Sequence, residues 1–110
     1  MSSSYFIKRN DTKGTIECNL LDGDSTAADL TGATVKFLMR REGRSDAKVD
    51  AEASVVGDPA EGIVSYQWQA ADTDTAGDYE AEFEVTFSDG RVATFPSDGY
   101  ISVKVLADVR

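Results

Sequence analysis

Apolar and polar side chains alternate with a period of two along most of this 110-residue chain. Such alternation is the pattern of a β-strand that buries one of its faces. It predicts eight strands, which cover residues 6–9, 14–22, 33–41, 48–56, 63–69, 77–88, 91–95 and 100–106. No segment longer than a turn has helical periodicity. We therefore expect an all-β fold of seven or eight strands, packed as a two-sheet sandwich around one core.

Turn-forming residues separate the predicted strands. Residues 22–25 read Asp-Gly-Asp-Ser, and residues 57–62 read Gly-Asp-Pro-Ala-Glu-Gly, which are both typical of turns. Asp89-Gly90 predicts a two-residue hairpin turn of type I′. Pro96 has no N–H for a sheet ladder, so it is expected to end the strand before it.

Residues 75–81 read Thr-Ala-Gly-Asp-Tyr-Glu-Ala and lead into the longest predicted strand. This segment resembles the corner before strand F of immunoglobulin-like domains, where a tyrosine hydroxyl bonds back to upstream backbone. Tyr79 would be that tyrosine, Gly77 lies in the turn, and Ala81 stands where those domains carry a cysteine. The alternative is that Tyr79 is an ordinary core aromatic of an alternating strand. We favour the corner, and with it an immunoglobulin-like sandwich without a disulfide.

The chain carries 20 acidic and 11 basic residues, a net charge of -9 at pH 7. This balance argues against nucleic acid and against membranes as partners, because phosphates and anionic lipids attract basic proteins. A chain of this length forms one domain, residues 1–110, in which residues 1–4 and 107–110 are expected to be flexible.

Cys18 is the only cysteine, so no disulfide can form within the chain. Its spacing with Ile16 and Leu20 predicts a buried, inert thiol on the apolar face of a strand. The first residues have no apolar run typical of a secretory signal, so we expect synthesis in a cytoplasm.

Residue types that carry chemistry are scarce. Histidine, the commonest general base and metal ligand, is absent from the sequence. Glu80, Glu82 and Glu84 follow one another about 7 Å apart on one strand face. That face is opposite the apolar one, so a solvated stripe explains them better than a glycosidase pair. Aspartates in the loops around residues 22–24 and 72–78 lack EF-hand spacing, and turn formation explains them. We expect no enzyme activity and no cofactor, and a weak calcium site stays open.

The same glutamates suggest a surface for association. Glutamate at each outward position of a strand would protect a sheet edge from pairing with another chain. If the strand is central, the row could instead meet the basic side chains of a second copy. These would come from one predicted loop and the strand before it, at Arg40, Arg41 and Arg44. This interpretation predicts a homo-oligomer, a trimer or a ring.

Two long segments together resemble a known family. Residues 20–24 and 29–40 read Leu-Leu-Asp-Gly-Asp and Asp-Leu-Thr-Gly-Ala-Thr-Val-Lys-Phe-Leu-Met-Arg. Residues 62–83 run from Gly-Ile-Val-Ser-Tyr-Gln-Trp through the corner, and residues 94–101 read Thr-Phe-Pro-Ser-Asp-Gly-Tyr-Ile. In combination they resemble the N-terminal domain of phage baseplate upper proteins, over about residues 5–105.

The resemblance implies an immunoglobulin-like sandwich in a tailed-phage virion, with other virion proteins as partners and no catalytic residues. Typical members continue into a long region that holds receptor-binding proteins. Because this sequence stops at Arg110, we expect a non-enzymatic baseplate or tail adaptor, made in the host cytoplasm. A capsid decoration (cement) protein on the phage head is the alternative. A host-surface or carbohydrate-binding module would need exposed aromatic residues, and its candidates are Tyr66, Trp68 and Tyr100.

Overall fold

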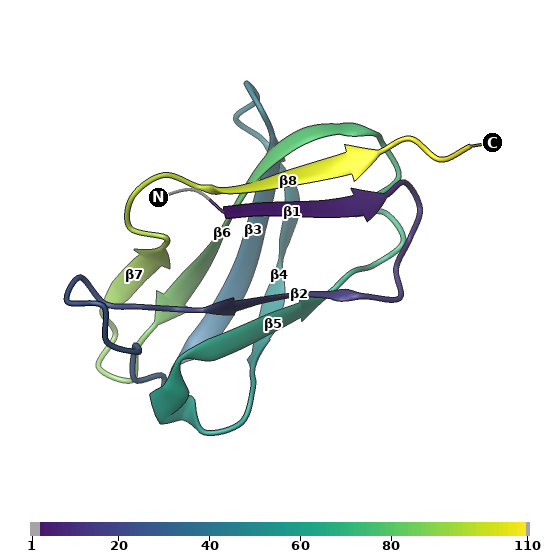
Figure 1. Cartoon of the computed structure of the whole chain (residues 1–110). Helices are drawn as coiled ribbons and strands as arrows, with labels where there is room; N and C mark the ends of the chain where they lie inside the picture. Colours follow the sequence, from purple (N-terminus) through teal and green to yellow (C-terminus); the bar gives the residue numbers. More distant parts are fainter. Residues whose placement is uncertain (1–2, 110) are drawn as a thin grey trace.

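The computed structural model describes residues 3–109, which contain eight β-strands (Figure 1). The strands are β1 (Ser3–Lys8), β2 (Thr15–Asn19), β3 (Thr34–Arg41), β4 (Ala47–Val55), β5 (Ile63–Gln67), β6 (Gly77–Thr86), β7 (Val92–Phe95) and β8 (Ile101–Leu106). A short 3-10 helix, η1 (Pro59–Glu61), lies between β4 and β5. Within the described residues, no helix is long and apolar enough to span a membrane. The prediction of an all-β fold with seven or eight strands is confirmed.

The strands follow a hydrogen-bonded path in the order β1-β8-β6-β3-β4-β5-β2, and β7 lies beside β6. The path bends at β4, whose first part pairs with β3 and whose last residues, Ser54 and Val55, pair with β5. β5 and β2 therefore form a smaller second layer against the larger sheet (Figure 1). The order β8-β6-β3-β4 corresponds to strands G, F, C and C′ of variable immunoglobulin domains. The fold is consistent with the expected immunoglobulin-like sandwich.

Aromatic side chains fill the space between the two layers. Phe37 on β3 is fully buried, and its ring stacks on that of Tyr66 from β5 at a centroid distance of 4.6 Å. Trp68 meets the Phe37 ring edge-on at 5.6 Å, and Phe83 of β6 lies 5.1 Å from it. Burying such rings removes about 150–250 Å² each from water, so they dominate the energy of the core. Phe37 thus lies at the core's centre, on the strand where antibody domains carry their buried tryptophan.

The first strand differs from its prediction. The sequence predicts flexible residues 1–4 and a first strand from residue 6, but Ser3 and Ser4 lie in β1 and pair in parallel with the start of β8. Hydrogen bonds of the backbone hold these two serines in the strand, and Ile7 packs in the core. Because serine is polar, the alternation of apolar and polar residues could not predict that the strand begins at residue 3. The prediction for the first two residues and for the last one falls outside the described residues. Residues 107–109 have no regular secondary structure.

The hairpin between β6 and β7 also differs from its prediction. A type I′ turn needs positive φ at both central residues, and Asp89 does not have it. Gly90, with a φ of 90°, donates its N–H to the Phe87 carbonyl at 2.9 Å. Phe87 in turn donates its N–H to the Arg91 carbonyl at 2.8 Å. The loop therefore consists of three residues, 88–90, one more than the predicted turn, and it ends in a glycine of left-handed conformation.

Candidate interaction surfaces

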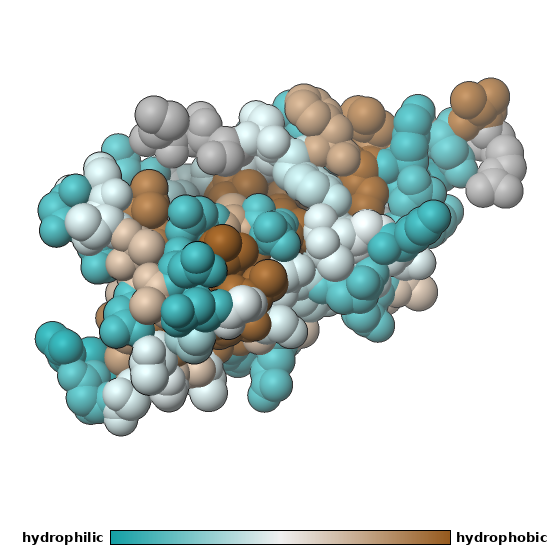
Figure 2. All heavy atoms as spheres, turned by 60° about the horizontal axis from the view of Figure 1, so that its bottom comes forward, coloured by the Kyte–Doolittle hydropathy of each residue, from teal (hydrophilic) through white to brown (hydrophobic). Residues whose placement is uncertain are grey.

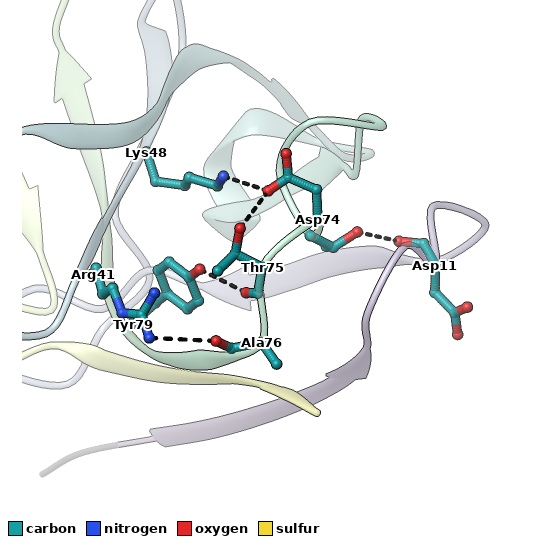
Figure 3. A network of polar contacts seen from close by, with 8 residues as sticks. Asp11, Arg41, Lys48, Asp74, Thr75, Ala76 and Tyr79 are labelled. Atoms are coloured by element: carbon teal, nitrogen blue, oxygen red, sulfur yellow. Dashed lines mark hydrogen bonds and ion pairs between the residues drawn. The ribbon is translucent and has the colours of Figure 1, made fainter. Parts of the chain in front are cut away.

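The segment before β6 forms a corner around Tyr79 (Figure 3). The buried Tyr79 donates a 2.7 Å hydrogen bond from its hydroxyl to the carbonyl oxygen of Thr75. Gly77 has a φ of 154°, and a Cβ there would lie 2.9 Å from the guanidinium of Arg41. That guanidinium covers the Tyr79 ring at 6.0 Å and donates to the Ala76 carbonyl at 3.4 Å. The structure therefore contains the hydrogen bond that an immunoglobulin-type tyrosine corner requires.

Hydrogen bonds hold the loop before this corner at two of its residues, the buried Asp72 and the exposed Asp74. Asp72 is buried and accepts hydrogen bonds from the Tyr66 hydroxyl at 2.6 Å and from the Gln69 N–H at 2.8 Å. Burial, together with this bond, raises the pKa of Tyr66. At the surface Lys48 donates to Asp74 at 2.6 Å, and this bond lowers the pKa of Asp74 (Figure 3). The loop therefore has a fixed shape at this end of the sandwich.

Glu80, Glu82 and Glu84 lie on the outward face of β6, in the middle of the larger sheet. All three are half-buried, because β3 flanks β6 on one side and β8 and β7 share the other. Their register partners on β3 are, in the same order, Arg40, Leu38 and Lys36. Since β6 is a central strand, the edge-protecting role considered for these glutamates does not apply.

Contacts within the chain neutralise part of this outer face. The Nε of Arg40 donates to a carboxylate oxygen of Glu80 at 3.0 Å, and this bond raises the pKa of Arg40. The same guanidinium lies over the Tyr100 ring at 5.3 Å and donates to the Tyr100 hydroxyl at 3.1 Å. Glu82 has no ion-pair partner among residues 3–109. The middle of the face therefore keeps an uncompensated carboxylate beside an arginine that is already engaged.

The three arginines do not form one basic surface. Arg40 and Arg41 are consecutive on β3, so their side chains point to opposite faces, one to the outer glutamates and the other to the tyrosine corner. Arg44 lies with Arg41 around a shallow hollow near Lys48. The sequence places these residues together, but strand geometry separates Arg40 from the other two.

A groove of about 250 Å³ opens between the two layers, where β2 ends and the chain passes from β7 to β8. Its apolar lining consists of Cys18, Leu20, Leu21, Phe95, Pro96 and Ile101. Figure 2 brings the lower side of Figure 1 forward and shows apolar side chains reaching the surface in the middle of that face, bordered by hydrophilic ones.

Cys18 is half-buried rather than buried as predicted, because it lies on the edge strand β2 and borders this groove. Burial, with a contribution from the negative charge of Glu17, raises the pKa of the Cys18 thiol. The thiol is therefore protonated at neutral pH, which disfavours it as a nucleophile.

Two of the three aromatic residues considered for sugar binding belong to the core. Tyr66 and Trp68 are buried between the layers, and only Tyr100, which is 39% exposed, reaches the surface. A stacking platform made of all three is therefore not available in this fold.

The loop carboxylates between β2 and β3 bind their own loop. Asp24 and Asp29 each accept a 2.6 Å hydrogen bond from the hydroxyl of the threonine two residues on, and a 3.1 Å bond from its N–H. These bonds lower the pKa of both carboxyl groups. In the described part of the chain, no group of three or more carboxylate or cysteine side chains is arranged to hold a metal ion.

Sequence reasoning missed the exposed apolar side chains near the sheet edges. Phe6 on β1 and Val92 on β7 are both 59% exposed, and Leu106 at the end of β8 is 41% exposed. A signal for Phe6 was present, because Tyr5 and Ile7 on either side of it point inward and alternation turns Phe6 outward.

Three comparisons relate the chain to known proteins. A family model described as the BppU N-terminal domain matches residues 4–96. None of the curated proteins matches the sequence. Among solved structures, the crystal structure of CopC from Methylosinus trichosporium OB3b is similar, with 12% sequence identity and a TM-score of 0.54. That similarity covers 98% of this chain and 88% of the CopC chain, and at this identity it shows a shared fold alone.

Proposed function

The chain belongs to the BppU N-terminal domain family of phage baseplate proteins, and from this membership we propose that it docks onto other virion proteins as a baseplate or tail adaptor. The family is structural and not enzymatic, and it implies a location in the virion. The match over residues 4–96 is the observation that carries the proposal. In this role the protein acts by binding alone and is made in the cytoplasm of the host.

We place the docking surface on the outer face of the larger sheet, around Glu82. This carboxylate has no ion-pair partner within residues 3–109, since Arg40 is engaged by Glu80. Leu38 beside it is half-buried, and Tyr100 is 39% exposed. A face that combines an unpaired carboxylate with apolar and aromatic surface fits a partner that presents an arginine or lysine next to an apolar side chain.

Charge reversal at Glu82 tests this surface in the phage that encodes the chain. We expect virions made with Glu82→Lys to carry much less of this protein, because the substituted lysine would repel the basic partner. Glu61→Lys is the matched control, since it makes the same charge change at an exposed turn away from the sheet. Quantitative mass spectrometry of purified virions measures the amount. Full incorporation of the Glu82→Lys chain would exclude this docking surface.

The copy number of the unmodified protein tests the adaptor role itself. An adaptor is expected at a small multiple of the tail's symmetry, counted against the major capsid protein in the same virions. A copy number close to that of the capsid protein would replace the adaptor with a decoration protein of the head. Absence from purified virions would contradict both roles.

A further inference from the structure

We infer that β1 pairs with β1 of a second copy of this chain, so that two larger sheets join edge to edge in a twofold-symmetric dimer. This inference is independent of the proposed function. β1 is an edge strand, because within the described residues β8 is its only strand partner. The unpaired N–H and C=O groups of an edge strand are a template for the addition of another strand.

The free backbone groups of β1 belong to its even-numbered residues. β1 and β8 are parallel, Lys8 is the register partner of Leu106, and the Arg9 N–H donates to the Leu106 carbonyl at 2.7 Å. Successive residues of a strand direct their N–H and C=O groups to opposite sides. The odd-numbered residues therefore bond to β8, and Ser4 and Phe6 direct their backbone groups away from it.

An antiparallel pair of β1 strands, centred on Phe6, brings these groups together. Phe6 of one copy then lies opposite Phe6 of the other, and Ser4 lies opposite Lys8. Even-numbered residues face even-numbered residues, so outward N–H groups meet outward carbonyls. No two like charges are opposed in this register, which removes the usual electrostatic cost of pairing a strand with itself.

Exposed apolar surface lies at the centre of this pairing. Phe6 is 59% exposed, and Leu106, on the same outward face of the neighbouring strand, is 41% exposed. In the dimer the two Phe6 rings become a cross-strand pair flanked by Leu106, which removes both side chains from water. Proteins protect edge strands with charged residues or proline; β1 contains no proline, and only its last residue, Lys8, is charged.

Electrostatics distinguish β1 from the other edges. The net charge of -9 opposes the association of two copies. β2 carries Glu17, whereas residues 1–9 contain two basic residues, Lys8 and Arg9, and no acidic one. In the hairpin beside β7 the charge of Asp89 is compensated by Arg91, but β7 has only four residues, against six in β1. β1 is therefore the edge at which two copies approach with least repulsion. Because salt screens the remaining repulsion between two copies, we expect added salt to strengthen dimerisation. Added salt would instead weaken the binding of the acidic chain to a basic partner, which depends on attraction between opposite charges.

The expected dimer is a concentration-dependent one. Pairing two six-residue strands buries less than a standard interface of about 1,600 Å². Such an interface gives a reversible dimer in solution. In a particle that holds copies near one another, the high local concentration would favour it further.

Sedimentation velocity across a wide range of protein concentration tests the inference. We expect a monomer–dimer equilibrium that Phe6→Lys weakens about tenfold or more, because it opposes two like charges and removes the apolar pair. Val92→Lys is the matched control, since Val92 is equally exposed on the strand β7, and it should leave the equilibrium unchanged. A monomer at every concentration, a trimer, or an equal effect of the two variants would overturn the inference.

A cysteine at the twofold axis gives a second test, which decides the question even if Phe6→Lys does not fold. Directly opposed residues of a hydrogen-bonded antiparallel pair have Cα atoms about 5.5 Å apart, a separation that a disulfide can span. In a Cys18→Ser background, Phe6→Cys should form a disulfide-linked dimer under mild oxidation, and Val92→Cys should not. A monomeric Phe6→Cys chain, or equal cross-linking of both, would contradict the β1 pairing.

Discussion

Tyr79 connects the core to the surface loop at the entrance of β6. Its ring is buried, and its hydroxyl reaches the carbonyl of Thr75, four residues back along the chain. One side chain therefore fixes both the packing of a strand and the path of the loop that leads into it. The sequence motif reveals this bond because both partners lie in the same short segment.

Removing the Tyr79 hydroxyl should destabilise the fold without disturbing its core. For Tyr79→Phe we expect a loss of about 1 kcal/mol in the free energy of unfolding, since one intramolecular hydrogen bond is lost. In a domain of this size that loss lowers Tm by about 4–8 °C. Tyr100→Phe is the control, because the Tyr100 hydroxyl is on the surface, where it accepts a hydrogen bond from the half-buried Arg40 side chain. Thermal and urea unfolding measure both, and equal effects would contradict a structural role for the corner.

Gly62 should tolerate substitution far less well than Gly90. Both have positive φ, at 69° and 90°. A Cβ at Gly62 would lie 2.8 Å from the backbone oxygens of Leu20 and Ala28, whereas nothing lies within 4 Å of a Cβ at Gly90. Gly90→Ala should therefore cost only the backbone strain, about 1 kcal/mol, and Gly62→Ala clearly more. Urea unfolding of the two variants gives the comparison, and similar stabilities would refute the steric argument.

The connection from β5 to β6 is held as a unit by a buried carboxylate. Asp72 accepts from both the Tyr66 hydroxyl and the Gln69 N–H, so it joins the end of β5 to the loop that enters the corner. Thr73, which is fully buried, donates its hydroxyl to the Asp11 carbonyl at 3.0 Å and ties this loop to the connection between β1 and β2. The loop is therefore part of the folded core.

Asp72→Ala should be strongly destabilising, by about 2 kcal/mol or more, because it leaves a buried hydroxyl and a backbone N–H without their acceptor. Asp74→Ala, two residues on, should have a small effect, because its pair with Lys48 is exposed to water. Chemical denaturation of both variants measures the difference. A large loss of stability in Asp74→Ala alone would reverse this assignment.

Strand positions could be predicted because alternation is a local property, whereas pairing is not. β7 and β8 begin within one residue of their predicted starts. Pairing depends on the register between β3 and β6, which puts β6 in the middle of the sheet and brings Arg40 next to Glu80. Those two residues are forty positions apart in the sequence. No short-range pattern contains this information. The separation of Arg40 from Arg41, in contrast, follows from strand parity and could have been predicted from the sequence.

At the scale of the whole molecule, the net charge of -9 is the dominant electrostatic feature. Six acidic side chains and four basic ones lie on the outward face of the larger sheet alone. They are Lys8, Lys36, Arg40, Asp50, Glu52, Asp78, Glu80, Glu82, Glu84 and Lys104. Exposed ion pairs on this face contribute little to stability, so the repulsion among the remaining carboxylates decides the sign of the salt effect.

Added salt should therefore stabilise the protein. The screening length falls from about 30 Å at 0.01 M to about 8 Å at 0.15 M ionic strength, which weakens repulsion across the whole domain. We expect Tm to rise over this range when measured by calorimetry at low protein concentration. Glu52→Lys changes the net charge from -9 to -7, by removing one negative charge and adding one positive charge, and should reduce the rise. A Tm that falls with salt would show that attraction outweighs repulsion.

The parallel pairing of β1 with β8 has a mechanical consequence. Ser3–Lys8 lies alongside Ile101–Leu106, so a force that drags one strand lengthwise past the other acts along the ladder and loads all of its hydrogen bonds together in shear. A hairpin pulled apart from its open end instead loses its bonds one at a time. This strand pair therefore acts as a mechanical clamp. Under tension between the first and the last strand of the chain, we expect the domain to resist extension and then to yield in one abrupt step.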